Sequence, residues 1–197
     1  MSIDPETVSA YNERARDYTK LAAPNAPYHA LNEFIALVPK GGRVLDFGCG
    51  PARTAAAMRD AGLVVDAMDA SQSMVDLAKK SYNIDVTLGS FDDLDKVDLY
   101  DGIWASFSLL HAPKAELPRH LAAIKTAIKA GGIFHISMKT GTGEQRDKIG
   151  RFYAYYSKEE LVDLLKAAGF RPNHFATGAD KGLDGTVAPW IMIRAYA

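Results

Sequence analysis

Five short apolar runs alternate with helical patterns over residues 43–138, and this alternation limits the folds open to the chain. The runs are rich in β-branched residues and cover 43–47, 64–68, 85–88, 100–106 and 133–138. Because they lack the polar alternation of a half-exposed strand, we expect strands that are covered on both faces. A strand–helix–strand order of this kind favours a parallel sheet with right-handed crossovers.

Helix signals fill the intervals between these runs. Six helices are predicted from capping residues and from apolar side chains at helical spacing. They run from 5 onward and over about 28–37, 51–61, 72–80, 117–128 and 158–168. After Gly169, the segments 170–177 and 189–196 look extended, which predicts a hairpin. The expected fold class is therefore α/β, with a mostly parallel seven-stranded sheet, helices on both faces and an antiparallel C-terminal edge hairpin.

Composition narrows the class of protein. A length of 197 residues corresponds to one domain with some decoration. Lys and Arg number 23 against 24 Asp and Glu, so the basic surplus of a sequence-independent nucleic-acid binder is missing. A single cysteine, Cys49, argues against a disulfide framework and favours a reducing, cytoplasmic location. The first ten residues lack the order of a secretion signal, and no apolar run is long enough for a membrane span.

The segment 43–54 carries the strongest functional signal. A buried strand runs into Gly48 and Gly50 and then directly into a helix. Glycines let a ligand approach the backbone, and a helix that starts near Ala52 directs N–H groups and its positive end at an anionic group. In an open α/β sheet this place is the ligand-binding cleft. The structural alternative is a tight strand-to-helix turn with no ligand.

An acidic residue ends the second run. Asp69 lies 23 positions after Asp46 and can accept hydrogen bonds from both ribose hydroxyls of an adenosine. This feature indicates a nucleoside without distinguishing between cofactors, and a solvated capping aspartate is the alternative. A dinucleotide fingerprint requires a third glycine where this chain has Arg53, whose bulk opposes close packing against a pyrophosphate.

The pattern Asp46-x-Gly48-x-Gly50 at a strand end resembles motif I of the class I S-adenosylmethionine-dependent methyltransferases. Ala52 stands where that family usually has a third glycine. The resemblance extends over about 40–175, and the segment 156–170 is similar to one shared by many methyltransferases of small bacterial metabolites. It implies a Rossmann-like fold, S-adenosylmethionine as cofactor and S-adenosylhomocysteine as product.

The cofactor contacts expected from these motifs and from the resemblance come from the glycine turn, the ends of neighbouring strands and an N-terminal tyrosine. They are Tyr18, Asp46, Gly48, Cys49, Gly50, Asp69, Ala70, Met74, Ser90, Phe91 and Ala105. For Phe91 a place in the core is an equal alternative. Tyr11 and Tyr18 share a helical face and either cover the cofactor or pack in the core.

The acceptor side is expected after the fourth strand and in the glycine-bearing loop 139–156. His111, Arg151 and Tyr155 are the candidate catalytic residues. His111 would act as a base or an orienting group, with a satisfied structural histidine as the alternative. An arginine of the loop would hold a carboxylate or phosphate of the acceptor, unless the loop is solvated and its aromatics pack on the sheet. The other histidines show no metal-ligand spacing, so no bound metal is expected.

These expectations define one methyltransferase domain over 1–197. It comprises an N-terminal helical cap (1–38), a cofactor-binding core (40–138), a substrate-side loop (139–156) and a C-terminal helix and hairpin (157–197). The hypothesis is methyl transfer to a small molecule by a monomer or homodimer, with no nucleic-acid or membrane partner. A nicotinamide-dependent oxidoreductase and a non-catalytic S-adenosylmethionine-binding protein remain as alternatives.

Overall fold

The computed structural model describes residues 4–20 and 25–197, except for the side chains of Arg16 and of residues 18–20 and 25–28. Its strands are β1 (Arg43–Phe47), β2 (Val64–Asp69), β3 (Thr87–Leu88), β4 (Tyr100–Ser106), β5 (Ile128–Lys139), β6 (Glu144–Arg146), β7 (Phe152–Ala154), β8 (Arg171–Lys181) and β9 (Val187–Tyr196). Seven of these strands form one sheet in the order β3-β2-β1-β4-β5-β9-β8, and β6 pairs with β7 separately. Strands β1 to β5 are parallel, whereas β9 runs antiparallel to both β5 and β8. The predicted fold class is confirmed.

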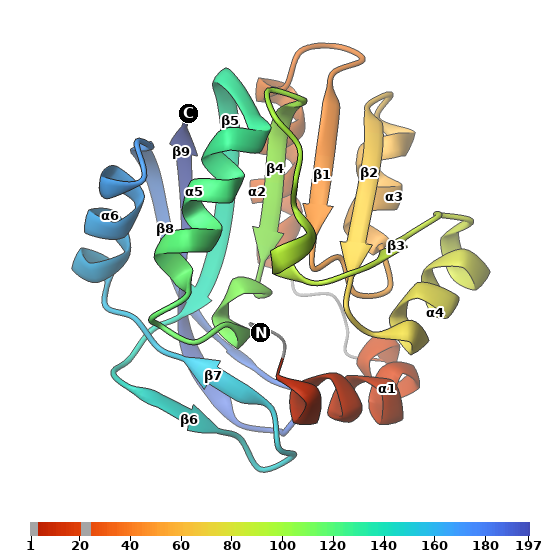
Figure 1. Ribbon diagram of the computed structural model, residues 1–197. Helices are drawn as coiled ribbons and strands as arrows, with labels where there is room; N and C mark the ends of the chain where they lie inside the picture. The colour runs from red at the N-terminus through yellow and green to blue at the C-terminus, as the bar shows by residue number, and fades with distance from the viewer. Residues whose placement is uncertain (1–3, 21–24) are drawn as a thin grey trace.

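Helices cover both faces of the large sheet (Figure 1). They are α1 (Pro5–Lys20), α2 (Asn25–Leu37), α3 (Arg53–Asp60), α4 (Gln72–Tyr82), α5 (Leu117–Ala127) and α6 (Lys158–Ala167), with 3-10 turns η1 (Phe91–Asp93) and η2 (Leu109–His111). Helices α5 and α6 bury one face, and α2 and α3 bury the other, while α4 packs beside α3. The strands between them carry apolar side chains on both faces, which explains why their sequences lack polar alternation.

Each face of the sheet has its own apolar core. On the α2 side, Phe34 meets Trp104 edge to face, with ring centroids 5.3 Å apart. On the α5 side, Ile103 and Phe134 pack with Leu121, and all three are fully buried. Burying a side chain of this size is worth about 1.5–3 kcal/mol, so these two layers hold the strand ends in fixed positions.

Two of the predicted helix starts are confirmed by their hydrogen bonds. The Ser71 hydroxyl accepts the N–H of Met74 at 3.3 Å at the start of α4. At α6, Ser157 accepts the N–H of Glu160 at 3.1 Å, and the Glu160 carboxylate accepts the N–H of Ser157 at 2.7 Å. Caps of this kind contribute about 1 kcal/mol each and fix where each helix begins.

Several predicted boundaries shift by a few residues. The third strand keeps only the last two residues of the predicted 85–88 segment, and α3 begins two residues later than expected because Ala52 adopts a left-handed conformation (φ 61°) at its N-cap. Strand β5 begins at Ile128, before the glycine pair, because Ile128 pairs with Tyr100 across a register shift. The two strands of the C-terminal hairpin, β8 and β9, are longer than predicted.

The segment 139–156, predicted as a loop, contains a short hairpin. Gln145 of β6 pairs with Tyr153 of β7, and the connecting turn includes Gly150 at φ +88°. The carboxylate of Asp147 accepts the N–H groups of Ile149 and Arg151, each at 3.0 Å, and so closes the turn. An Asp-x-x-Gly turn ahead of an aromatic run is the sequence signal for this hairpin.

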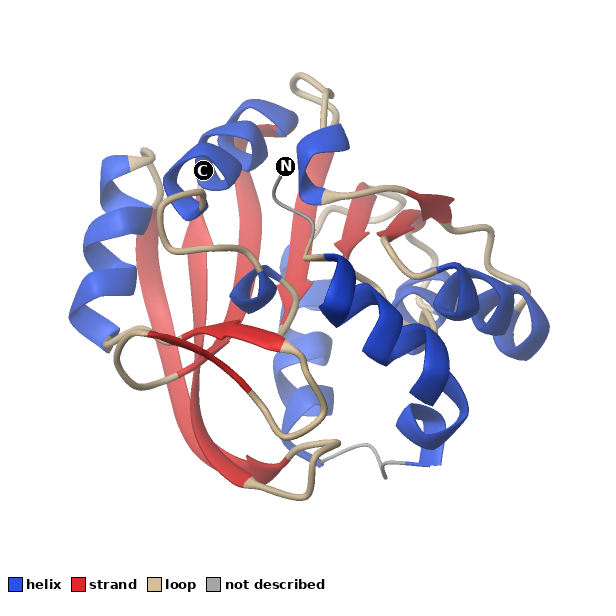
Figure 2. Ribbon diagram, turned by 60° about the horizontal axis from the view of Figure 1, so that its bottom comes forward, coloured by secondary structure: helices blue, strands red, loops and turns tan. Residues whose placement is uncertain are grey.

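The carboxyl ends of β1, β2 and β4 meet at one edge of the sheet. Helix α1 crosses this edge, and the β6–β7 hairpin lies beside α1 (Figure 1). Figure 2, in which this edge comes forward, shows the same arrangement. Two segments that are far apart in the sequence, α1 and the β6–β7 hairpin, therefore cover the place where open α/β sheets bind their ligands.

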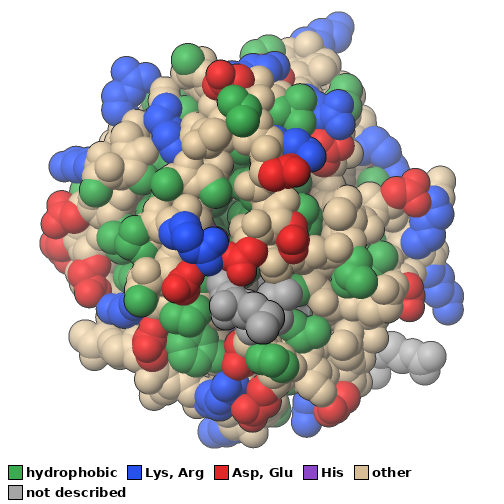
Figure 3. All heavy atoms as spheres, viewed as in Figure 1, with side chains coloured by type: hydrophobic (Ala, Val, Ile, Leu, Met, Phe, Trp, Pro, Cys, Tyr) green, Lys and Arg blue, Asp and Glu red, His purple; other side chains and the backbone are tan. Residues whose placement is uncertain are grey.

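Charged side chains are dispersed over the surface. On the face shown in Figure 3, basic and acidic side chains are interspersed, and the described residues drawn there form no continuous basic patch. Within the described ranges, no helix combines the length and the apolar character needed to cross a bilayer.

Candidate functional site

A cleft of about 790 Å³, counting its part open to solvent, separates α1 from the carboxyl ends of the central strands. Its walls are the turn after β1, the junction of β2 and α4, the start of η1, the segment after β4, and α1 with the residue before it. The lining residues are Asp4, Thr7, Val8, Tyr11, Phe47, Gly48, Gly50, Met68, Asp69, Ala70, Ser71, Met74, Gly89, Ser90, Phe91, Ser106, Phe107, Ser108 and His111.

The glycine turn after β1 is held against the end of β2 by its own N–H groups. Those of Gly48 and Cys49 donate to the carbonyl of Met68 at 2.9 and 3.0 Å, and that of Gly50 donates to Asp69 Oδ2 at 2.7 Å. These three N–H groups of the turn are therefore used by the fold itself.

Glycine at position 48 has a packing reason as well. Its φ is +76°, and an added Cβ would lie 2.3 Å from the Cβ of Ser108. The Ser108 hydroxyl in turn donates to the carbonyl of Phe47 at 2.7 Å. The turn after β1 and the segment after β4 are thus in direct contact, and any side chain at 48 would force them apart.

Asp69 lines the cleft next to the glycine turn, to which it is directly hydrogen-bonded. Its two carboxylate oxygens accept the N–H groups of Gly50 at 2.7 Å and of Ser71 at 2.9 Å. A carboxylate has about four acceptor positions, so each oxygen can accept one more hydrogen bond. Burial raises the pKa of Asp69 above its ordinary value, while the N–H donors oppose that shift. The carboxylate is therefore fixed in place with acceptor capacity left for the two hydroxyls of a ribose.

The neighbouring wall suits a flat apolar group such as a purine. Ala70 and Met74 line it from the start of α4, and Ser90 and Phe91 line it from η1. The ring of Phe91 also meets that of Phe47 edge to face at 5.2 Å, so Phe91 belongs both to the core and to the cleft. These four predicted cofactor contacts lie together, beside Asp69.

Asp46 lies beneath the glycine turn and does not line the cleft. Its side chain is 3% exposed and accepts the N–H of Ala55 in the first turn of α3. Its Oδ2 has no hydrogen-bond partner among the described residues. Burial, with a smaller contribution from the charge of Asp69, raises the pKa of Asp46 to about 7. Asp46 therefore supports the turn from below.

This raised pKa gives a testable pH dependence. Between pH 4 and 7 the folded state retains a proton that the unfolded state, with its ordinary pKa of 3.8, has released, so this group makes the protein less stable as the pH rises. Asp46→Asn removes the effect. We expect the difference in unfolding free energy between wild type and variant to change by a few kcal/mol across this window in thermal denaturation. Parallel curves for wild type and Asp46→Asn would contradict it.

Helix α1 is fastened to the β6–β7 hairpin at its N-terminal end. Asp4 accepts two hydrogen bonds from the guanidinium of Arg146, at 2.7 and 2.8 Å. The hydroxyl of Thr7 accepts the N–H of Phe152 at 2.8 Å. Since Asp4 and Thr7 both line the cleft, the hairpin positions this part of the cover.

The same helix is fastened to α4 on the nucleoside side. Asn12 Oδ1 accepts the hydroxyl of Ser71 at 2.7 Å and the N–H of Ser73 at 3.1 Å. Ser71 therefore caps α4, lines the cleft and binds α1, the helix that covers the cleft.

A chain of hydrogen bonds runs from His111 to a buried ion pair. The Nδ1 atom of His111 lies 2.6 Å from the carbonyl of Phe152, which can only accept, so Nδ1 carries the proton. Nε2 then accepts the hydroxyl proton of Tyr11 at 2.8 Å, and the Tyr11 oxygen accepts an N–H of Arg151 at 3.1 Å. Arg151 also donates twice to Asp147 Oδ2, at 2.7 and 2.9 Å.

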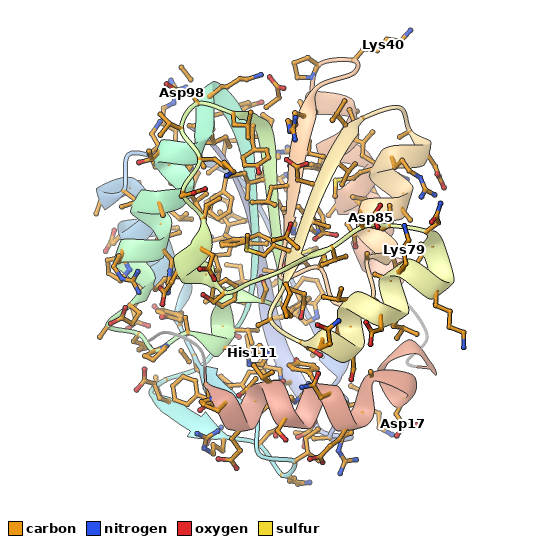
Figure 4. All side chains as sticks on the ribbon, turned by 45° about the vertical axis from the view of Figure 1, so that its right-hand side comes forward. Asp17, Lys40, Lys79, Asp85, Asp98 and His111 are labelled. Atoms are coloured by element: carbon orange, nitrogen blue, oxygen red, sulfur yellow. The ribbon has the colours of Figure 1, made fainter. Side chains whose placement is uncertain are left out.

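The ring of His111 is neutral in this arrangement. Burial is the main cause that lowers its pKa, to about 4, and the positive charges of Arg151 and Lys139 add to the shift. Figure 4 shows His111 between the ends of the strands and α1. His111 thus lines the cleft, but its basic nitrogen is occupied by the hydroxyl of Tyr11.

Four other predicted site residues do not line the cleft. Ala105 is fully buried on the α5 face, because alternation along β4 directs Ser106 rather than Ala105 to the cleft. Cys49 is buried in the turn with its thiol toward the carbonyl of Gly50. Arg151 is buried against Asp147, and Tyr155 packs over Gly141. The side chain of Tyr18 lies outside the described residues.

Several lining residues went unrecognised from sequence. Thr7 and Val8 of α1 and Phe107 after β4 are examples. Nothing in the sequence marks Phe107, but its backbone conformation is unusual in the structure. Its φ is 53°, which is rare for a residue with a side chain and is found more often near functional sites. No local pattern marks Thr7 and Val8, because their place depends on how α1 packs over a distant edge.

The sheet order, the glycine turn and the carboxylate at the end of β2 define a Rossmann-like nucleoside-binding fold of the class I methyltransferase type. The cleft suits S-adenosylmethionine: Asp69 keeps two acceptor positions for a ribose, and the adjoining wall is apolar.

Comparison with known proteins gives the same class. Residues 44–132 match the methyltransferase domain family. An uncharacterized methyltransferase of Staphylococcus carnosus is 32% identical over 81% of this chain and 73% of its own length. A ubiquinone biosynthesis O-methyltransferase of Coxiella burnetii is 29% identical over 92% of this chain and 82% of its own. The chain belongs to the class I S-adenosylmethionine-dependent methyltransferase family, and S-adenosylmethionine is its cofactor.

Solved structures share the fold. The 1,6-didemethyltoxoflavin-N1-methyltransferase of Burkholderia thailandensis, with 1,6-didemethyltoxoflavin and S-adenosylhomocysteine bound, superimposes with a TM-score of 0.74 at 22% identity, over 95% of this chain and 84% of that one. The [4+2]-cyclase SpnF gives 0.68 at 20% identity, over 85% and 79%. Because a cyclase has this fold too, the fold alone does not specify the reaction.

Proposed function

We propose that this enzyme transfers the methyl group of S-adenosylmethionine to a small-molecule acceptor that enters beside His111. The observation that carries the proposal is the fixed Asp69 carboxylate, which lines the cleft beside the Gly48–Gly50 turn. Asp69 would accept the two ribose hydroxyls, and Met74 and Phe91 would enclose the adenine. The methionine part would then extend past Gly48 towards the end of β4.

The bound cofactor supplies an electrophilic methyl group, so the protein has mainly to orient the acceptor and exclude water. Helix α1 would exclude water, because it covers the cleft between its contacts with α4 and with the hairpin. His111 would orient the acceptor or take its proton once the Tyr11 hydroxyl has given way. Arg151 would act as a positioning residue, since it holds Tyr11 and is itself held by Asp147.

A small acceptor is supported by three observations. The cleft is covered by α1, which is held by hydrogen bonds to α4 on one side and to the β6–β7 hairpin on the other. The sequence has no basic surplus, and the described residues on the face shown in Figure 3 form no continuous basic track for a polyanion. The relatives from Coxiella and Burkholderia carry names that refer to ubiquinone biosynthesis and to 1,6-didemethyltoxoflavin. A cytoplasmic enzyme, monomeric or dimeric, remains the prediction from the sequence, as does the division of the chain into four functional segments.

Calorimetry with S-adenosylhomocysteine and with NAD tests the cofactor. We expect S-adenosylhomocysteine to bind with a dissociation constant in the micromolar range and NAD to show no saturable heat, because Arg53 stands where a dinucleotide site has its third glycine. Transfer of a labelled methyl group to metabolite fractions then separates an enzyme from a non-catalytic binder. Binding of NAD alone would refute the proposal, and tight S-adenosylhomocysteine binding without any transfer would favour the binder.

A further inference from the structure

The part of the cleft beyond the glycine turn is lined by the last residue of β4 and by the segment that follows it: Ser106, Phe107, Ser108 and His111. The polar side chains of this group differ in what they already bind. The hydroxyl of Ser108 donates to the carbonyl of Phe47 at 2.7 Å. Nε2 of His111 accepts from Tyr11 at 2.8 Å. Among these described residues, the hydroxyl of Ser106 is therefore the polar side-chain group that still has capacity for a ligand.

This hydroxyl belongs to a chain of hydrogen bonds that leads into the sheet. Ser106 is the register partner of Ser137 on β5, and it donates to the Ser137 hydroxyl at 3.3 Å. Ser137 Oγ lies 2.9 Å from Nε2 of His135, two residues earlier on the same strand. Ser137 and His135 are buried, whereas Ser106 is half-buried and lines the cleft. The chain thus has one end in the cleft and the other in the core.

The inner end of the chain is a fixed and neutral histidine. The ring of His135 stacks on that of Trp104, with centroids 3.5 Å apart and planes only 8° from parallel. Burial is the main cause that lowers the pKa of His135, to about 3, and the positive charges of Arg194 and His174 add to the shift. A neutral imidazole has one N–H and one bare nitrogen, so only one of its two ring nitrogens can accept a proton from a hydroxyl.

The direction of the chain decides what Ser106 offers to the cleft. Ser137 accepts the hydroxyl proton of Ser106 and must place its own proton on another acceptor, because a buried hydroxyl is rarely left unpaired. Nε2 of His135 is the acceptor within reach. With both protons directed inward, the lone pairs of Ser106 Oγ remain for a hydrogen-bond donor in the cleft.

The position of Ser106 corresponds to the amino-acid end of the cofactor. Strand β1 lies between β2 and β4 in the sheet, so the ends of β2 and β4 are two strand spacings apart, or about 10 Å. With the ribose on Asp69 at the end of β2, the amino-acid chain of the cofactor runs past Gly48 towards the end of β4. It carries an α-ammonium and an α-carboxylate. An oxygen whose own proton is directed inward suits the ammonium, which can only donate.

We propose that Ser106 accepts a hydrogen bond from the α-ammonium group of the cofactor, and that Ser137 and His135 are positioning residues that keep its lone pairs directed to the cleft. The inference rests on the proposed placement of the cofactor. Hydrogen bonds with one ionised partner are about twice as strong as those between neutral groups. Each bond of the chain also polarises the next, which makes the Ser106 oxygen a better acceptor.

A matched pair of variants tests the hydroxyl. Ser106→Thr keeps it, and Ser106→Val replaces it by a methyl group of similar size; both residues are common in strands. In calorimetry, S-adenosylhomocysteine should bind to Ser106→Val about tenfold more weakly than to Ser106→Thr, because one hydrogen bond to a charged group is lost. The analogue of S-adenosylhomocysteine that lacks the amino group but keeps the carboxylate should bind to both variants with affinities within about twofold of each other.

Nitrogen NMR of the wild-type enzyme tests the direction of the chain. Ring nitrogens with and without a proton differ widely in chemical shift, and His135→Phe identifies the His135 signals of the ¹⁵N-histidine-labelled protein by their loss. We expect the proton on Nδ1 and a bare Nε2. His111 is the internal reference for this tautomer, since its Nδ1 donates to the carbonyl of Phe152 at 2.6 Å.

Equal affinities of the Thr and Val variants for S-adenosylhomocysteine would overturn the proposal, and so would an equal loss of affinity for both ligands. A proton on Nε2 of His135 would overturn it as well, because Ser106 would then direct its own proton to the cleft. Normal binding of S-adenosylhomocysteine by Ser106→Val refutes only the role of Ser106, whereas absence of binding by the wild-type enzyme refutes the proposed function itself.

Discussion

Asp69→Ala is expected to weaken the binding of S-adenosylhomocysteine by about a hundredfold or more. Hydrogen bonds to a charged group contribute about 1.5–3 kcal/mol each, and the ribose would lose two of them. The variant also removes the acceptor of the Gly50 N–H, whose bond of 2.7 Å fixes the glycine turn. Isothermal calorimetry measures the loss. Asp69→Asn, which keeps one acceptor oxygen but not the charge, should lie between wild type and Asp69→Ala.

Asp66→Ala is the matched control for this experiment. Asp66 lies on the same strand, three residues earlier, and pairs with Arg43 at 2.8 Å instead of facing the cleft. The affinity of the Asp66→Ala variant for S-adenosylhomocysteine should stay within about twofold of wild type. If the folded Asp69→Ala variant bound the cofactor normally, Asp69 would not be the ribose ligand. Gly48→Val is a poor substitute, because its Cβ would collide with Ser108 whatever the ligand does.

The cofactor half of the cleft could be predicted because its parts are local in sequence. A strand that runs into Gly48 and Gly50, and a second strand that ends at Asp69, need only the parallel pairing of β1 with β2 to come together. Capping patterns such as Ser71 at α4 fix the neighbouring wall. Ala105 was predicted to contact the cofactor, but the next residue, Ser106, lines the cleft instead. A shift by one residue along a strand moves a side chain to the opposite face of the sheet.

The cover of the cleft could not be predicted, because its contacts join residues far apart in sequence. Arg146 reaches Asp4 and Arg151 reaches Tyr11 across about 140 positions, and neither side of these pairs carries a local pattern. From sequence, Arg151 looked like a group for the substrate. The structure instead bonds it to Asp147 and Tyr11, so its net effect is on the stability and position of the cover.

Asp147→Ala is therefore expected to destabilise the fold by about 3–5 kcal/mol, the usual cost of leaving one partner of a buried ion pair alone. The side chains of Arg151 and Asp147 are only 3% and 5% exposed. The variant also deletes the acceptor that closes the turn through the N–H groups of Ile149 and Arg151. At about 2–4 °C per kcal/mol for a chain of this size, the melting temperature should fall by about 10 °C, measured by calorimetry.

A surface pair and a double variant distinguish the buried charge from a general loss of contacts. Asp60→Ala is the surface control, because the Asp60 carboxylate also accepts hydrogen bonds from Nε and Nη2 of an arginine, Arg59. Asp60 is 67% exposed, so this substitution should lower the free energy of unfolding by less than about 1 kcal/mol. Adding Arg151→Met to Asp147→Ala should restore part of the lost stability, because no unpaired cation then remains buried. A double variant less stable than Asp147→Ala alone would mean that Arg151 stabilises the cover through Tyr11 rather than through its charge partner.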